Sequence, residues 1–347
     1  MRALGILRGF PGLGRVVSGT AILETLRDDY SWDIKIISYL QGNSFLKNRG
    51  YPISPDVTEM DYCSIGLLPT HRMGVYIHEQ IKTYQPDIII VDGEPLILHS
   101  LRISYPHLKI VALLNPSDVD NPQNDREAME FFNSMYQQAT IAIVHGLRSV
   151  YEIEGYPKLI SVGTILRKEL FSICNQPSNH IYCILGGGTV NVGAQFVEST
   201  IQIARLSMAA AEYLPDYQFH IICSSDNIYD KMAAAIPKNV LLHREILDAI
   251  TYYSDAALVV TRSGRNTLSE LAYLGIPGIS FVSGCRYRRA EQEQNIQSLN
   301  ASNICMSDTH ICLTDFVTLC KTQIQKGKQI SEFQIGNDTA IQQILSL

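Results

Sequence analysis

The chain has 347 residues, 46% of them hydrophobic and 18% charged, with a formal net charge of −6. That length predicts two domains with substantial apolar cores, and the acidic balance argues against a general nucleic-acid-binding protein. No apolar run approaches the ~20 residues that a membrane-spanning helix needs. The first residues, Met1–Gly14, lack the long apolar stretch of a secretory signal peptide.

The eight cysteines and nine histidines follow no metal-site spacing. No CxxC, HxxxH or HExxH pair occurs, so a zinc site is not expected. Cys183 and Cys223 fall inside apolar runs, where a free cysteine behaves as a small apolar residue. These patterns predict a cytoplasmic protein with reduced thiols, without a bound metal or cofactor.

Apolar, strand-like runs alternate with helical segments along the whole chain. The first set comprises Arg2–Leu7, Asp33–Tyr39, Asp87–Gly93, Lys109–Asn115 and Ile141–Gly146. The second set comprises His180–Gly188, Phe219–Ser225, Val240–Arg244, Ala256–Val260 and Ile276–Val282. Strand–helix alternation predicts an α/β fold with parallel sheets, here two doubly wound Rossmann-like domains. The pattern alone does not forbid a single closed barrel.

The polar segment Ser161–His180 separates the two sets of strands. We therefore predict an N-terminal domain over residues 1–163, a second domain over residues 164–335 and a final helix over residues 336–347. Two such domains are expected to face each other across a cleft, a common location for small-molecule sites. In open parallel sheets, ligands bind beyond the carboxyl ends of the strands, so the loops there are the candidate sites.

The stretch Thr261–Gly278 follows the strand Ala256–Val260 and has helical apolar spacing, ended by Gly275 and Pro277. A helix that begins near Gly264 directs free N–H groups and a partial positive charge at an anion, such as a diphosphate. Side-chain donors and charge accompany it, and a carboxylate further along can accept from ribose hydroxyls. These residues are Ser263, Arg265, Asn266, Thr267 and Glu270. The alternative is that Ser263 caps the helix and Glu270 is a solvated face residue.

Two more loops and one helix start have weaker signals. The glycine turns Gly186–Gly188 and Gly12–Gly14 each follow a strand and open a helix, which suits either phosphate approach or tight packing. Glu291–Gln294 precede an apolar helical pattern. Glu291 and Gln292 there suit hydrogen bonds to sugar hydroxyls, or form an ordinary polar first turn.

Taken together, these motifs resemble the GT-B nucleotide-sugar glycosyltransferases, in particular those related to the peptidoglycan lipid-intermediate N-acetylglucosaminyltransferase. The resemblance extends over most of the chain, but its specific part is Thr261–Asn295. The loop around Gly12 and Gly14, the strand Pro86–Leu96 and the linker Val162–Arg167 also look like that superfamily.

The resemblance implies a site in which the second domain binds the donor and the first binds the acceptor. Glu270 would hold the ribose, Glu291 and Gln292 would touch the donor sugar, and Ile246 would offer backbone groups to the base, usually uracil. Residues expected at the phosphates are Gly14, Arg167, Gly187, Ser263, Gly264, Arg265, Asn266 and Thr267.

One position departs from the family pattern. The Gly-x-Gly loop is usually followed by a histidine that serves as base or positioning residue, and here Arg15 follows. An arginine stays protonated and cannot serve as an ordinary general base. Arg15 suits neutralisation of an anionic acceptor or leaving diphosphate, whereas Asp92 and Glu94 are the nearest candidate bases. A buried Glu94 with a raised pKa would deprotonate an acceptor hydroxyl; the alternative is a solvated loop.

The resemblance implies transfer of a sugar from a nucleotide-diphosphate donor, most simply a UDP-sugar, to an unknown acceptor hydroxyl. Inversion without a metal is expected, because helix N-termini and Arg265 replace the cation. A nucleotide-sugar hydrolase or epimerase, or a non-catalytic nucleotide-sugar-binding protein, remains an alternative. Peripheral contact with the inner face of the membrane through Gly66–Ile81 is also left open, against an acceptor loop and a core-facing helix.

Overall fold

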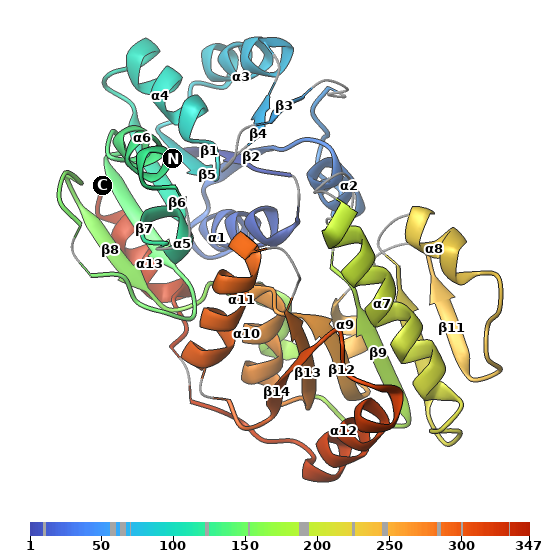
Figure 1. Ribbon diagram of the computed structural model, residues 1–347. Coiled ribbons are helices and arrows are strands. Elements are labelled where there is room, and N and C mark those ends of the chain that lie inside the picture. Colours follow the sequence, from blue (N-terminus) through green and yellow to red (C-terminus); the bar gives the residue numbers. More distant parts are fainter. Residues whose placement is uncertain are drawn as a thin grey trace. The chain divides into compact units, whose positions relative to one another are not determined.

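The computed structural model describes residues 1–9, 12–55, 60–62, 67–69, 71–121, 125–151, 153–186, 194–223, 226–244, 249–282, 286–299, 301–332 and 334–347. It divides the chain into two units (Figure 1). The first unit is Met1–Arg167 together with Gln334–Leu347, and the second is Lys168–Phe333. The final segment, which the sequence sets apart as a helix of its own, is thus part of the first unit.

The first unit is a parallel six-stranded sheet in the order β2-β1-β5-β6-β7-β8, with a separate antiparallel pair, β3-β4. Its strands are β1 (Arg2–Leu7), β2 (Asp33–Ile37), β3 (Met60–Tyr62), β4 (Leu67–Pro69), β5 (Ile88–Asp92), β6 (Lys109–Leu114), β7 (Ile141–His145) and β8 (Leu159–Val162). Its helices are α1 (Gly14–Tyr30), α2 (Gln41–Asn48), α3 (His71–Tyr84), α4 (Pro95–Ser104), α5 (Pro116–Val119), α6 (Arg126–Tyr136) and α13 (Asn337–Leu345).

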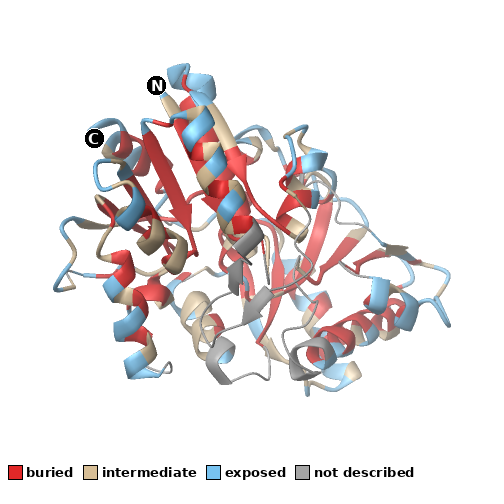
Figure 2. Ribbon diagram, turned by 90° about the horizontal axis from the view of Figure 1, so that it is seen from above, coloured by how far each residue is buried: buried red, intermediate tan, exposed pale blue. Residues whose placement is uncertain are grey.

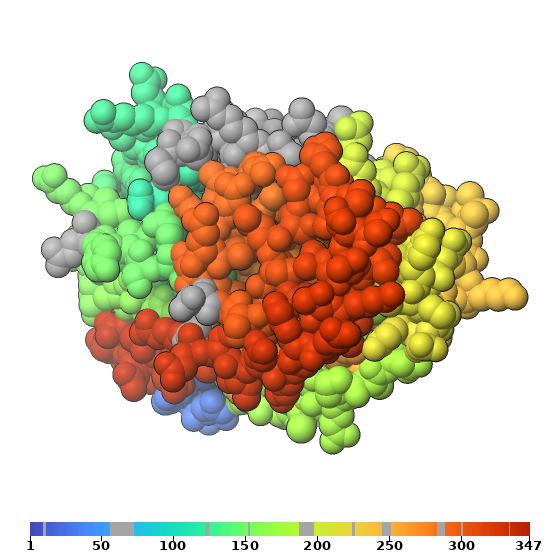
Figure 3. Space-filling view, turned by 60° about the horizontal axis from the view of Figure 1, so that its bottom comes forward, coloured from blue at the N-terminus to red at the C-terminus, as the bar shows by residue number. Residues whose placement is uncertain are grey.

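The last helix, α13, completes the core of the first unit. Its residues Ala340, Ile341 and Ile344 are buried in the same cluster as the side chains of α1. Figure 1 shows α13, in red, beside the green strands β7 and β8, and in Figure 3 dark red residues lie next to green ones on the surface. Asn337 anchors its first turn, because its side-chain Oδ1 accepts from the Leu166 amide at 2.9 Å and its Nδ2 donates to the Leu166 carbonyl at 2.8 Å.

Helix α3 includes most of Gly66–Ile81, the segment for which membrane contact and a core-facing helix were both considered. Met73, Ile77 and Ile81 are spaced four residues apart and are buried, so this side of the helix faces the core, as the alternative predicted. Residues 66 and 70 of that stretch lie outside the described residues. Within the part of the chain that the structure describes, none of the helices has the length and apolar character that spanning a membrane requires.

The second unit has a parallel sheet in the order β11-β10-β9-β12-β13-β14. Its strands are β9 (His180–Ile184), β10 (Gln218–Ile222), β11 (Val240–His243), β12 (Ala256–Arg262), β13 (Gly278–Val282) and β14 (Ile304–Asp308). Its helices are α7 (Ala194–Ala211), α8 (Asp226–Met232), α9 (Ala249–Tyr253), α10 (Arg265–Leu274), α11 (Arg286–Leu299) and α12 (Leu313–Lys326), with a 3-10 turn at Lys168–Ser172. Counted along the chain, the strand order is 3-2-1-4-5-6, the Rossmann order.

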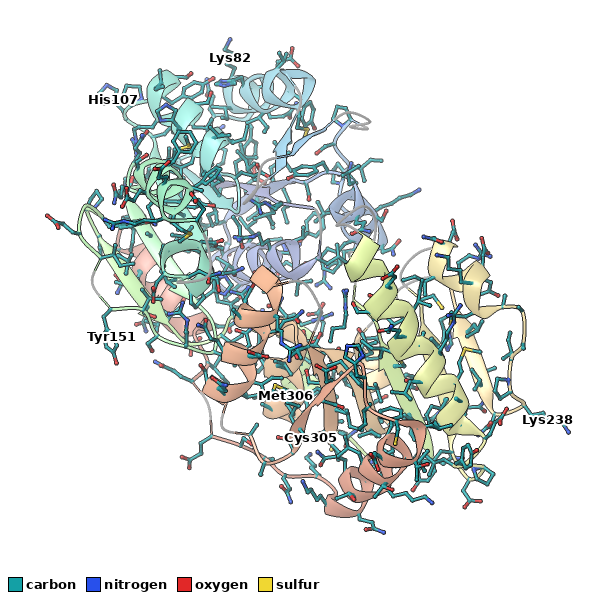
Figure 4. All side chains as sticks on the ribbon, in the orientation of Figure 1. Lys82, His107, Tyr151, Lys238, Cys305 and Met306 are labelled. Carbon is teal, nitrogen blue, oxygen red and sulfur yellow. The ribbon has the colours of Figure 1, made fainter. Side chains whose placement is uncertain are left out.

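Both sheets are covered by helices, which the α/β prediction requires. Figure 2 shows the strands buried and the helices with one buried and one exposed side. The sequence missed two outer strands, β8 and β14. In β14, Cys305 packs against the core while Met306 is 47% exposed, and Figure 4 labels both. Alternation of buried and exposed residues is a weaker sequence signal for a strand than a continuous apolar run, and β14 was not predicted for this reason.

Three histidines that are scattered in the sequence form a row on one face of the second sheet. His180 Nδ1 lies 2.6 Å from His220 Nε2, and His220 Nδ1 lies 3.0 Å from His243 Nε2. They come from neighbouring strands, displaced by two residues at each step, so they share a face. The distances are those of N–H···N hydrogen bonds between rings. No group of three or more metal-ligating side chains with metal-site geometry occurs within the described residues.

This histidine row predicts a loss of stability in weak acid. Burial, with His243 and His180 nearby, lowers the pKa of His220 from 6.5 to about 4, against a small opposing effect of Asp255. His220 is therefore protonated below pH ~6.5 in the unfolded chain, but only below pH ~4 in the folded unit. Stability from His220 is full above pH 6.5 and is lost as pH falls toward 4. Between pH 7 and pH 5, the free energy of unfolding should therefore fall in wild type by about 2 kcal/mol more than it falls in His220→Gln.

Urea unfolding followed by circular dichroism at the two pH values tests this expectation. His310→Gln is the matched control, because its side chain is 87% exposed in the same unit. An equal pH dependence in wild type and His220→Gln would show that the row does not exclude a proton.

Candidate active site

The candidate catalytic residues lie where the strand order of the first sheet reverses. β1 and β5 are neighbours, with β2 on one side and β6 on the other. Arg8 follows β1, Asp92 ends β5, and Glu94 is the residue before α4. Loops at the carboxyl ends of such strands diverge, which leaves room for a ligand and makes this the expected site in an open parallel sheet.

Arg15, in the first turn of α1, is held between two carboxylates. Its Nη1 donates to Asp92 Oδ1 at 2.7 Å, and its Nη2 donates to Asp118 Oδ1 and Oδ2 at 2.6 and 2.8 Å. Burial disfavours the charge, but Asp118 and Asp92 outweigh it and raise the pKa of Arg15 further. Asp118 carries a pKa below its usual range because Arg15 and the Asn115 amide overcome its desolvation. An anionic substrate at Arg15 would compete with both carboxylates.

Gly93 allows this arrangement. Its φ is +79°, in the left-handed region, and a Cβ there would come within 2.4 Å of Arg15 Cδ. The Arg15 side chain therefore packs against the backbone of Gly93, with Asp92 and Glu94 on either side of that glycine in the chain. Both carboxyl groups are fully buried, which rules out the solvated loop considered from the sequence.

Glu94 differs from Asp92 in how its charge is compensated. The Tyr39 hydroxyl donates to Glu94 Oε1, and Arg8 Nε lies 3.8 Å from the same oxygen. Glu94 Oε2 is buried and accepts no hydrogen bond from any described residue. Desolvation raises the pKa of Glu94 to about 7, although Arg8, Tyr39 and Arg15 act in the opposite direction. A carboxyl with this pKa exchanges a proton readily at neutral pH.

The candidate donor site lies at the corresponding reversal in the second sheet, where β9 and β12 are neighbours. Gly264 is the exposed residue before α10, and no side chain caps the helix there. Four N–H groups at such an end have no partner within the helix. Gly264 has a φ of −75°, so any residue could adopt its backbone; its lack of a side chain matters for approach.

Ser263 was expected to donate to the phosphates, and the structure corrects its orientation. Its side chain is fully buried and its Oγ lies 2.8 Å from Ser280 Oγ and 3.0 Å from the Phe281 carbonyl. The hydroxyl therefore ties β12 to β13, and the cap role considered for it is absent as well. The residue continues the strand alternation beyond the last predicted strand position, which turns it inward.

Glu270 is buried, and it is not the solvated face residue considered as the alternative. It is 2% exposed, and the Tyr253 hydroxyl donates to its Oε2 at 2.7 Å. Tyr253 ends α9, and the residues 245–248 before that helix, including Ile246, lie outside the described chain. Arg265 is 8% exposed and its Nε donates to Asn266 Oδ1 at 3.2 Å, while Asn266 and Thr267 are half-buried.

The remaining predicted donor residues are distributed as follows. α11 begins at Arg286, so Glu291 and Gln292 lie in its second turn and not just before it, which corrects the expected helix start. Gln292 is buried and Glu291 is half-buried. Gly14 opens α1, and Arg167 is a half-buried residue at the end of the first unit's main segment. Gly187 lies outside the described residues.

Sequence reasoning missed Tyr39 and Asp118. Tyr39 was read as the last residue of a strand, and Asp118 lies 103 residues from the arginine it binds. A local signal existed for Asp118 only: Asn115 and Asp118 have the spacing of a capping box at α5, and the Asn115 amide donates to Asp118 Oδ2 at 2.7 Å. That signal predicts a helix start and not a contact with Arg15.

Two Rossmann-like units of this topology, each with polar residues at its strand-order reversal, define the GT-B class of fold. Residues 183–341 match the family model "Glycosyltransferase family 28 C-terminal domain". A relative from Acetivibrio thermocellus, UDP-N-acetylglucosamine--N-acetylmuramyl-(pentapeptide) pyrophosphoryl-undecaprenol N-acetylglucosamine transferase, is 25% identical over 241 residues. The match covers 63% of this chain and 58% of that relative, less than two thirds of its length.

Solved structures share the fold over the whole chain. Acinetobacter baumannii MurG is 14% identical, with a TM-score of 0.55 and complete coverage of both chains. A putative UDP-N-acetylglucosamine 2-epimerase from Listeria monocytogenes is also 14% identical, with a TM-score of 0.57 over 99% of this chain and 95% of that one. The chain thus resembles MurG-like GT-B glycosyltransferases, while the fold alone is common to more than one chemistry.

Proposed function

We propose that this protein is a glycosyltransferase that moves a sugar from a nucleotide-diphosphate donor, most simply a UDP-sugar, to an acceptor hydroxyl. The second unit binds the donor, and the first unit provides the base and binds the acceptor. The observation that carries the proposal is the match to the family 28 C-terminal domain over the segment that presents the uncapped helix α10. The A. thermocellus relative is named for transfer of such a sugar.

The proposed reaction is a single displacement with inversion at the anomeric carbon. The acceptor oxygen forms the new bond to that carbon as the bond to the diphosphate oxygen breaks, and the nucleoside diphosphate leaves with the electron pair. Glu94 takes the hydroxyl proton. The N–H groups at the start of α10 and Arg265 stabilise the charge on the leaving group. Because Glu94 is fully buried, the reaction requires the loops around it to open for the acceptor.

A donor screen with turnover measurements tests the proposal. Thermal shift with UDP, UDP-N-acetylglucosamine and thymidine diphosphate should reveal binding, since a ligand at ~100 times its Kd adds roughly 2.7 kcal/mol of stability. Donor consumption that requires an added acceptor extract supports transfer. Release of free sugar in the absence of acceptor would contradict the proposal and indicate a hydrolase. Conversion of the donor to another sugar epimer would indicate an epimerase. Binding without turnover would indicate a nucleotide-sugar-binding protein.

Glu270→Ala is expected to weaken nucleotide binding by at least tenfold, because the ribose hydroxyls lose their acceptor. Titration calorimetry with UDP measures this. The substitution also breaks the hydrogen bond from the Tyr253 hydroxyl, so Tyr253→Phe is the matched control that breaks the same hydrogen bond and keeps the carboxylate. Equal affinities in wild type and Glu270→Ala, or equal weakening in both variants, would remove the ribose role.

A further inference from the structure

The strongest feature that the proposed function does not explain is the packing around Tyr39. This residue follows β2, is 2% exposed, and donates its hydroxyl proton to Glu94 Oε1. Its own pKa lies well above the usual value, because burial and the neighbouring Glu94 both disfavour the phenolate. The phenol therefore remains a donor throughout the range in which Glu94 titrates.

The backbone holds Tyr39 in place by close contacts. A Cβ on Gly9 would come within 1.9 Å of the Tyr39 carbonyl oxygen, and the Gly42 amide donates to that carbonyl at 3.0 Å. The next residue, Leu40, has φ 50° and ψ −124°, a conformation that non-glycine residues rarely adopt. Such strain persists only where the surrounding structure enforces it, and it concentrates at functional sites.

The two oxygens of Glu94 have unequal surroundings as a result. Oε1 faces the Tyr39 hydroxyl and Arg8, whereas Oε2 is buried without a hydrogen bond from any described residue. Glu94 is the N-cap residue of α4, but its carboxylate does not accept a hydrogen bond from the backbone of that helix. A proton on this carboxyl is held on Oε2, because a proton on Oε1 would oppose the Tyr39 donor.

We propose that Tyr39 is the positioning residue of the base, fixing Glu94 so that Oε2 is the oxygen that receives the acceptor's proton; this inference rests on the proposed function. Tyr39 does not touch the reacting atoms. Its hydrogen bond favours the ionised carboxylate, so it keeps the base available at neutral pH. Without that bond the carboxyl should hold its proton to higher pH.

The pH dependence of Tyr39→Phe tests this role. The acid limb of the turnover profile should move upward by about one pH unit or more, since a hydrogen bond to a charged group is lost. Turnover at pH 7 should fall roughly fivefold to tenfold and recover toward the wild-type rate near pH 9. Equal slowing at every pH would show a merely structural role and overturn the proposal.

A second measurement separates this inference from the proposed function. In protein labelled with ¹³C at the glutamate carboxyl, the Glu94 signal, assigned by its loss in Glu94→Gln, should titrate near pH 7 and shift upward in Tyr39→Phe. Tyr51→Phe is the matched control, because Tyr51 donates to Glu24 Oε1 at 3.0 Å in the same unit. A shift without turnover on any donor would sink the transferase alone; an unchanged titration in Tyr39→Phe would sink the positioning role alone.

Discussion

Glu94→Gln is expected to slow turnover by about 10²–10⁴-fold while donor binding is unchanged. Glutamine has the shape of the protonated acid but cannot accept the acceptor's proton, and Glu94 is not among the residues expected to bind the donor, most of which belong to the second unit. In wild type, turnover should rise with pH through about 7 and be lost below it, because the base acts in its ionised form. Release of nucleoside diphosphate measures the rate, and thermal shift with the donor measures binding.

Glu24→Gln is the control for removing a buried carboxylate from the first unit. Glu24 is 7% exposed and pairs with Arg49 at 2.7 Å, away from the Arg15 and Glu94 contacts. Its turnover and acid limb should match wild type. Full activity in Glu94→Gln would assign the proton to another group, and Asp92 would then be the remaining predicted carboxylate.

Arg15→Met is expected to destabilise the first unit by about 3–5 kcal/mol, since it removes the cation that pairs with the buried carboxylates of Asp92 and Asp118. Trp32, the only tryptophan of the chain, is 7% exposed in that unit and reports its unfolding selectively by fluorescence in urea. The expected result is a lower urea midpoint for the Trp32 transition.

Arg126→Met provides the comparison for an exposed ion pair. Arg126 and Glu130 are 91% and 64% exposed, so removing the arginine should leave the urea midpoint of the Trp32 transition nearly unchanged. Retained stability with lost activity in Arg15→Met would instead restore the substrate-binding role that the sequence suggested for Arg15. If Arg15→Met does not fold, Arg15→Lys, which keeps the charge but not the forked contact, should give a smaller shift in the same direction.

The apolar runs predicted the sheets well, because a strand buried on both faces carries its signal locally. Ile88, Ile89, Ile90 and Val91 are all fully buried in β5. The end of α10 was equally local: Gly275 has a φ of 71°, which a glycine adopts without strain. By contrast, β14 and the start of α11 lack such signals, since their residues are mixed in polarity.

The sequence by itself determined the α/β class, the two sets of strands and the loops in which polar residues gather. Only the tertiary structure decided what those polar residues do. Ser263 turns inward to bind β13, Arg15 is bound by Asp118 from helix α5, and Tyr39 reaches Glu94 across 55 positions. The physical reason is that periodicity reports burial of one segment, whereas hydrogen bonds and pKa values depend on neighbours that chain folding alone brings together.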